Sequence, residues 1–150
     1  MTVSRAPSLA ALLVFATGGA WAGGTGALRA DAAWIRVLPG DLPAAAYLTL
    51  RNAGDEEVAL TGARSASYRR IMLHRSAGVG GMEGMVPVAR LPVPAHGAVR
   101  LAPGGYHLML MDAVRPIAPG RKVTLTLIFD GGREKLDVAF LARPANATGP

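Results

Sequence analysis

The sequence predicts an all-β protein, either a sandwich or a barrel of about nine short strands. Short apolar runs recur along the chain and are separated by turn residues. Several of these runs alternate apolar and polar residues with the period of two that is typical of a strand. No segment keeps a helical period for three turns. The length of 150 residues suits a single domain.

Each expected strand follows from one of these runs, taken in chain order. They cover residues 32–37, 45–52, 58–65, 69–74, 85–91, 98–101, 106–111, 122–129 and 135–140. In the eighth run Leu125, Leu127 and Phe129 would share one face. The sequence Asp-Gly-Gly at 130–132 would join the last two strands as a hairpin. Glycine and proline at 103–105 and 118–120 mark other turns.

The first 22 residues have the three parts of a secretory signal. Arg5 supplies the positive start, residues 9–16 are apolar, and residues 20–22 form an A-x-A cleavage site before Gly23. The apolar part is too short to predict a membrane span. We therefore expect a periplasmic protein, cleaved after Ala22 and not inserted in a membrane. Residues 23–30 would be a flexible start, residues 31–142 the β domain, and residues 143–150 a disordered tail.

The composition excludes several classes of protein. The formal net charge is +6, but the basic residues are scattered rather than clustered, so we assign them to solvated faces and expect no nucleic-acid binding. The chain contains no cysteine, which argues against a disulfide scaffold, a thiolate metal site and a lipoprotein. We expect a monomer.

Two of the expected strands carry histidine and methionine on one face. In the run at 106–111, His107, Met109 and Met111 occupy alternate positions between leucines. In the run at 69–74, Met72 and His74 are also two residues apart. Because side chains alternate across a strand, each set would point to a single side.

A glycine-rich segment between these strands, residues 78–88, carries Met82 and Met85 and is expected to be a flexible loop. Together, the two strands and this loop hold every methionine beyond the initiator. The third histidine, His96, lies in a separate segment flanked by proline and glycine. Methionine often fills gaps in a core, and the pattern alone leaves open whether these side chains bind metal or pack.

If they bind metal, the donor types favour Cu(I). Thioether sulfur is neutral and soft, and it binds Cu(I) well but hard cations poorly. Imidazole also serves copper. A site without thiolate suits an oxidising compartment, where a free cysteine would be oxidised or paired. Neutral ligands suit a carrier, because a thiolate acceptor can take the ion from them.

The spacing of these residues resembles the motif of the periplasmic copper chaperones of the PCuAC type. Ten residues separate His74 from Met85, twenty-one separate Met85 from His107, and one separates His107 from Met109. The flanking sequences AWIR, AAAYLTLRNAG and LAPGGYHLMLM are similar to that family in the same order. The likeness covers residues 30–141.

This resemblance implies a cupredoxin-like β-sandwich with a Cu(I) site near one end. It implies His74, Met85, His107 and Met109 as the ligands. It also implies a non-enzymatic role, in which copper is carried to the binuclear copper centre of cytochrome c oxidase together with a thiol-bearing partner chaperone. The incoming thiolate would displace Met85 first, because we expect Met85 on the most mobile element.

The chain departs from the family pattern at two positions. Met72 stands where an acidic residue is frequent, and Arg75 follows His74 where an acidic residue is also common. Met72, Met82 and Met111 are auxiliary candidates. We expect Met72 to pack, Met82 to be able to replace Met85, and Met111 to belong to the core or to a wall that excludes water.

Three other functions compete with the carrier. A small copper redox protein of the blue-copper kind would need a cysteine thiolate, which the chain lacks. A haem carrier could use histidine and methionine as axial ligands, although the chain has no C-x-x-C-H motif. An interaction module would use the same residues only for packing and would show no metal affinity.

Overall fold

The structure is a computed structural model that describes residues 26–79 and 82–150. Ten strands and one short 3-10 helix form within these residues, and the all-β prediction is confirmed. In chain order the elements are β1 (Leu28–Arg36), β2 (Ala44–Asn52), β3 (Val58–Arg64), β4 (Tyr68–Val79), β5 (Met82–Pro87), β6 (Leu91–Val93), β7 (Gly97–Leu101), β8 (Tyr106–Ala113), β9 (Lys122–Phe129), η1 (Asp130–Gly132) and β10 (Glu134–Arg143).

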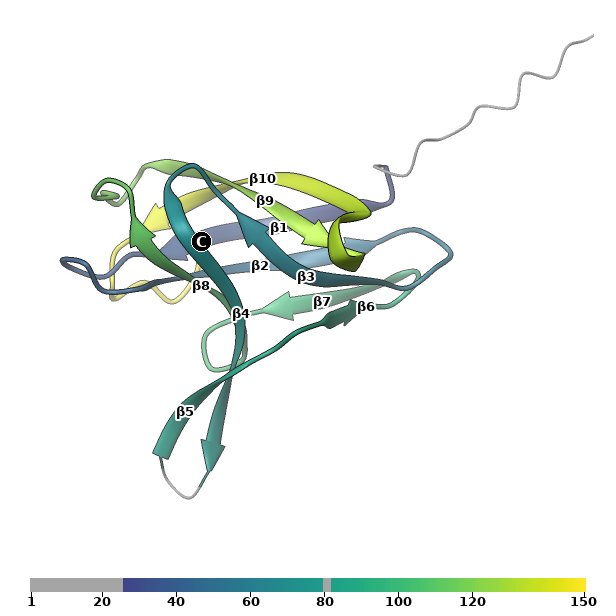
Figure 1. The fold of residues 1–150 in the computed structure, drawn as a ribbon, viewed down its shortest axis with the longest axis horizontal. Coiled ribbons are helices and arrows are strands. Elements are labelled where there is room, and N and C mark those ends of the chain that lie inside the picture. The colour runs from purple at the N-terminus through teal and green to yellow at the C-terminus, as the bar shows by residue number, and fades with distance from the viewer. Residues whose placement is uncertain (1–25, 80–81) are drawn as a thin grey trace, which may run out of the picture.

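The strands form a continuous hydrogen-bonded path that folds into a sandwich (Figure 1). Its order is β5-β4-β8-β2-β1-β10-β9-β3-β6, and β7 pairs with the second half of β2. The pairing of β1 with β10 is parallel, and the other pairings are antiparallel. β8 pairs with the start of β2 and also with β4. This order brings β4 and β8 together although 26 residues lie between the end of β4 at Val79 and the start of β8 at Tyr106.

The hydrophobic core lies between the layers, where one face of most strands is buried. In β9 the alternate residues Val123, Leu125, Leu127 and Phe129 are buried, as the sequence pattern predicts. The remaining fully buried side chains come mainly from β2, β8 and β10 and include Leu48, Leu50, Leu108, Leu110 and Phe140. The core therefore uses the leucines of β8 and leaves His107 and Met109 to the other face.

The domain begins earlier than residue 31, the boundary expected from the sequence. β1 starts at Leu28, which is buried and pairs with Asn52. A β-bulge between Asp31 and Trp34, with Ala32 at a positive φ of 50°, interrupts the alternation of this strand. Because the bulge breaks the alternation of apolar and polar residues, the sequence pattern does not indicate the first part of the strand.

The segment expected as a flexible loop is largely a β-hairpin. β4 continues to Val79 and pairs with β5, so that the two strands form an arm that projects from the sandwich (Figure 1). The run expected at 85–91 is divided between β5 and β6. The arm gave little sequence signal because most of its described side chains are exposed and need not alternate.

The tail expected to be disordered is partly ordered. Arg143 belongs to β10, and Ala147 N–H donates to the Pro144 carbonyl at 3.0 Å. The expected secretory signal at 1–22 lies outside the described residues. Among the residues that the structure describes, no helix is long and apolar enough to cross a membrane.

Candidate metal centre

Two histidines face each other across the pairing of β4 with β8. His74 is the direct cross-strand partner of His107, and their rings meet edge to face with centroids 5.9 Å apart. Only 8% of His74 and 3% of His107 is exposed. Both lie on the face of the sheet that points away from the hydrophobic core, because the neighbouring Leu73 and Leu108 enter that core.

The ring nitrogens of this pair are buried and largely unpartnered. His107 Nδ1 lies 3.2 Å from the Gly105 carbonyl, which can only accept, so the proton resides on Nδ1 and the lone pair on Nε2. His107 Nε2 and both nitrogens of His74 have no hydrogen-bond partner among the described residues. A buried polar atom without a partner is costly, and a bound ion would remove that cost.

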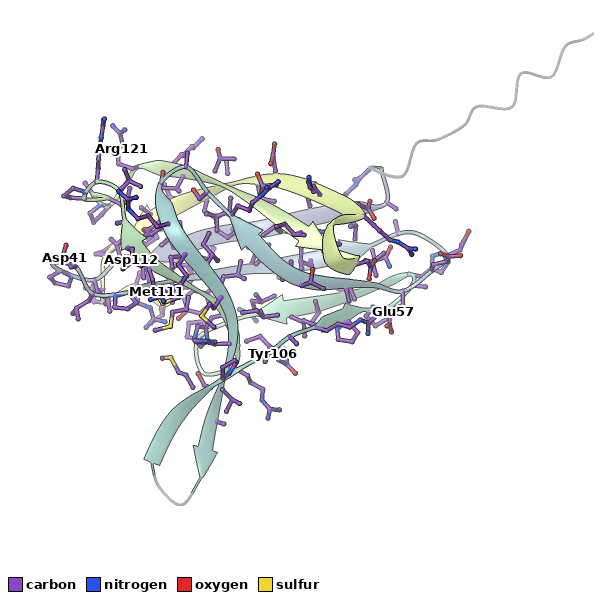
Figure 2. The ribbon with its side chains drawn as sticks, viewed as in Figure 1. Asp41, Glu57, Tyr106, Met111, Asp112 and Arg121 are labelled. Atoms are coloured by element: carbon purple, nitrogen blue, oxygen red, sulfur yellow. The ribbon has the colours of Figure 1, made fainter. Side chains whose placement is uncertain are left out.

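Thioethers lie beside the imidazoles on the same face. Met72 is the direct cross-strand partner of Met109, so each strand contributes one histidine and one methionine. Cβ atoms of such partners lie roughly 4.5–5.5 Å apart. Figure 2 shows the sulfur atoms gathered beside β4, near the labelled Met111. Met109 is half-buried, whereas 39% of Met72 is exposed.

Met85 reaches this group from the arm. It pairs with Ser76 on β4, which places it diagonal to His74 at a distance of roughly 7–8 Å between backbones. Its side chain is 58% exposed. The element that carries Met85 is therefore a strand at the base of a projecting hairpin, and not the loop expected from the sequence.

The other candidates lie further away. Met111 is opposite Arg70, two residues along β8 from Met109, and it is half-buried outside the core. Of the two roles expected for it, core or a wall that excludes water, the core is wrong and the wall stays a prediction. Met82 pairs with Val79, three residues further along the arm than Met85, and its side chain lies outside what the structure describes. His96 lies in the turn between β6 and β7, and its Nε2 is 2.8 Å from Asp55 Oδ1.

An aromatic and cationic group adjoins the histidines. The Tyr47 ring centroid is 6.4 Å from that of His107 and 4.7 Å from that of Trp34. Both Tyr47 and Trp34 are buried but lie outside the core cluster. The guanidinium of Arg36 lies over both aromatic rings and donates to the Tyr47 hydroxyl at 2.8 Å.

The surroundings keep His107 unprotonated at neutral pH. Burial is the main cause that lowers its pKa below 6.5, and electrostatic interactions with His74 and Arg36 act in the same direction. The hydrogen bond to the Gly105 carbonyl opposes them. A neutral imidazole with a bare Nε2 is the form that binds a metal ion.

The donor set suits a soft ion of low charge. In the ranges 26–79 and 82–150, no group of three or more histidine, cysteine, aspartate or glutamate side chains gathers as a metal site. The donors that do gather are two imidazoles and neighbouring thioethers, all neutral. Such a set fits a soft monovalent ion better than a hard or highly charged one.

Comparison with known proteins identifies the family. Residues 28–140 match the family described as "Putative lipoprotein LpqE-like". The chain belongs to the LpqE-like family. A curated relative, "Putative lipoprotein Lxx21020" of Leifsonia xyli subsp. xyli, is 32% identical over 106 residues, which make up 70% of this chain and 63% of the relative. The LpqE-like chain thus spans less than two thirds of that relative.

Solved structures similar to the LpqE-like chain are PCuAC domains. The apo PmoF2 PCuAC domain matches with a TM-score of 0.68 and 23% identity, over 83% of this chain and 96% of that domain. The solution structure of CuI-DR1885 from Deinococcus radiodurans matches with a TM-score of 0.63 and 35% identity, over 85% and 86% of the two chains. The predicted PCuAC-type family and cupredoxin-like sandwich are confirmed.

Some of the residues around the site of this LpqE-like chain were not predicted. In the sequence, Arg36, Tyr47 and Trp34 lie within flanks similar to the family and carry no predicted role. The available signal was strand parity, because Trp34 and Arg36 share a face opposite to the buried Ile35. The pairing of β2 with β8, which brings Tyr47 to His107, could not be deduced from parity alone.

Proposed function

We propose that this LpqE-like protein is an exported Cu(I) carrier that receives and releases copper by ligand exchange. The observation that carries the proposal is the group of three buried, unpartnered ring nitrogens beside the Met72–Met109 pair. The 35% identity with a protein whose solution structure is named for bound CuI supports the choice of ion.

The proposed ligands are His107 through Nε2, His74, Met109 and Met85. The first three come from two paired strands of the sandwich, so much of the site is formed before the ion arrives. Met85 would close over the ion from the arm. Met72 lies opposite Met109 and competes with Met85 for the fourth position.

Release would begin at the thioether that is most exposed. Met85 is 58% exposed and belongs to a hairpin outside the sandwich, so an incoming thiolate meets it first. The thiolate would replace Met85 and then the strand ligands, and copper would stay monovalent throughout. The protein makes or breaks no covalent bond of a substrate and acts as a carrier rather than an enzyme.

The cellular setting belongs to the same proposal. The signal-like residues 1–22 support export to the periplasm with cleavage after Ala22, and a monomeric mature chain would start at Gly23. The partners would be a thiol-bearing chaperone and the copper subunit of cytochrome c oxidase. The family and the curated relative are named for lipoproteins, but the sequence of this chain has no cysteine.

The first test is an anaerobic Cu(I) titration of the mature chain against a chromophoric chelator. We expect one tightly bound Cu(I) in the wild type and its loss in the His107→Ala/Met109→Ala variant. His96→Ala is the matched control, because His96 lies in a distant turn, and it should keep the ion. A wild type that yields all its copper to the chelator would refute the carrier and favour an interaction module.

A further inference from the structure

Arg36 is a cation close to the candidate metal centre that no carboxylate neutralises among the described residues. Other arginines there form ion pairs, as Arg51 does with Asp31 at 2.7 Å and Arg70 with Asp112 at 3.8 Å. Arg36 instead donates to the neutral Tyr47 hydroxyl, and its Nε is buried without a partner. Its positive charge is therefore uncompensated, and a guanidinium does not lose its proton in a protein.

The fold fixes this charge near the donors. Arg36 pairs with Ala45 on β2, and Ala45 pairs with Met109 on β8, so the three residues form one row across three strands. Neighbouring strands lie about 4.8 Å apart, which places the Arg36 backbone roughly 10 Å from that of Met109. The guanidinium carbon lies 5.2 Å from the Tyr47 ring centroid and 5.7 Å from that of Trp34.

The aromatic rings also reduce screening. Tyr47 is buried and lies close to both the guanidinium and His107, and Trp34 packs against it. A charge acts more strongly through such a medium than through water.

We propose that Arg36 is a charge-selectivity residue, which disfavours divalent ions at this site and so keeps it for monovalent copper. The inference rests on the proposed Cu(I) function. Electrostatic repulsion grows in proportion to the charge of the bound ion, so Arg36 opposes Cu(II) twice as strongly as Cu(I). Neutral ligands supply no opposing charge, and Arg36 adds a penalty that discriminates between oxidation states.

The test compares Arg36→Gln with Arg36→Lys and with Arg51→Gln. Arg36→Lys keeps the charge, and Arg51→Gln removes an arginine that Asp31 already neutralises. Affinities for Cu(I), Ag(I) and Cu(II) would be measured by competition, with the reduction potential of the copper-loaded protein and thermal unfolding of the apo protein as separate readouts.

Removal of the charge should raise metal affinity. If Arg36→Gln tightens Cu(I) and Ag(I) by a common factor, about threefold or more, it should tighten Cu(II) by the square of that factor. The ratio of Cu(I) to Cu(II) affinity then falls by the same factor that tightens Cu(I). A tenfold fall in this ratio would lower the reduction potential of the copper-loaded protein by about 59 mV. Arg36→Lys and Arg51→Gln should keep the wild-type ratio.

Four results would overturn the proposal. An unchanged ratio in Arg36→Gln would show that the charge does not act on the ion. A loss of affinity for all three ions would assign Arg36 a structural role, as would equal effects of Gln and Lys. A wild type that binds no Cu(I) would refute the proposed function itself. The wild-type titration shows this before any variant is compared.

Discussion

The imidazole of His107 is held in one tautomer by a backbone carbonyl, and this tautomer leaves the lone pair of the buried Nε2 free. The Gly105 carbonyl that accepts from His107 Nδ1 also accepts from the Ser76 N–H at 3.1 Å. This single oxygen therefore links the turn before β8 to β4 beside the site. A metal-binding histidine is commonly oriented by such a contact at its other nitrogen.

Proton competition at the histidines predicts a pH dependence. Because burial lowers the pKa of His107 from 6.5, the imidazole stays available at neutral pH, and Cu(I) affinity should fall below about pH 6. The stability of the apo protein should change in the same direction, since the unfolded chain takes up the proton more readily. The contribution of His107 to the free energy of unfolding should be fully present above pH 6.5. It should be lost as the pH falls through the lowered pKa of His107 in the folded protein.

Competition titrations between pH 5 and 8, with denaturant unfolding of the apo protein over the same range, would measure both effects. The His96→Ala variant should show the same dependence of Cu(I) affinity on pH, because His96 lies outside the site. A Cu(I) affinity that stays constant down to pH 5 would contradict histidine ligation.

At the scale of elements, the β4–β5 arm separates the exposed thioether from the strand donors. Met85→Ala should speed Cu(I) release to a thiol or chelator several-fold and leave the fold intact, since the side chain is largely solvated. Stopped-flow competition would measure the rate. Val86→Ala is the matched control, because Val86 is the next residue, is 45% exposed and pairs with Arg75 on the opposite face.

Equal release rates in the wild type and Met85→Ala would reject this order of events. The same measurement on Met72→Ala then decides which thioether leaves first. Faster release from Met72→Ala alone would give the fourth position to the methionine opposite Met109 and leave Met85 outside the site.

The sequence predicted which side chains share a strand face better than it predicted which strands meet. Strand parity placed His107 with Met109 and Met72 with His74, because a period of two depends only on local geometry. The pairing of β4 with β8 depends on which distant strands meet, and parity carries no information on this. The arm was missed because exposed strands need not alternate, and Arg36 was missed because its role depends on Tyr47 in another strand.

At the scale of the molecule, β8 serves two purposes on its two faces. Leu108 and Leu110 enter the core, whereas His107 and Met109 occupy the outer face with the donors of β4. In the proposed carrier, metal binding and folding would therefore depend on different side chains of one strand. The parallel β1–β10 pairing closes the sandwich on the far side of β2, so the outer face of β8 has only to hold the site.

This division predicts opposite effects for two adjacent substitutions. Leu110 is fully buried, so Leu110→Ala should lower the free energy of unfolding by about 2–5 kcal/mol. Below its unfolding transition it should still bind one Cu(I). Met109→Ala, one residue away on the half-buried outer face, should cost less stability but weaken Cu(I) binding. Denaturant unfolding and Cu(I) titration of both variants measure the two quantities. If Leu110→Ala weakened copper binding as much as Met109→Ala, the site would depend on core packing and the two faces would not be independent.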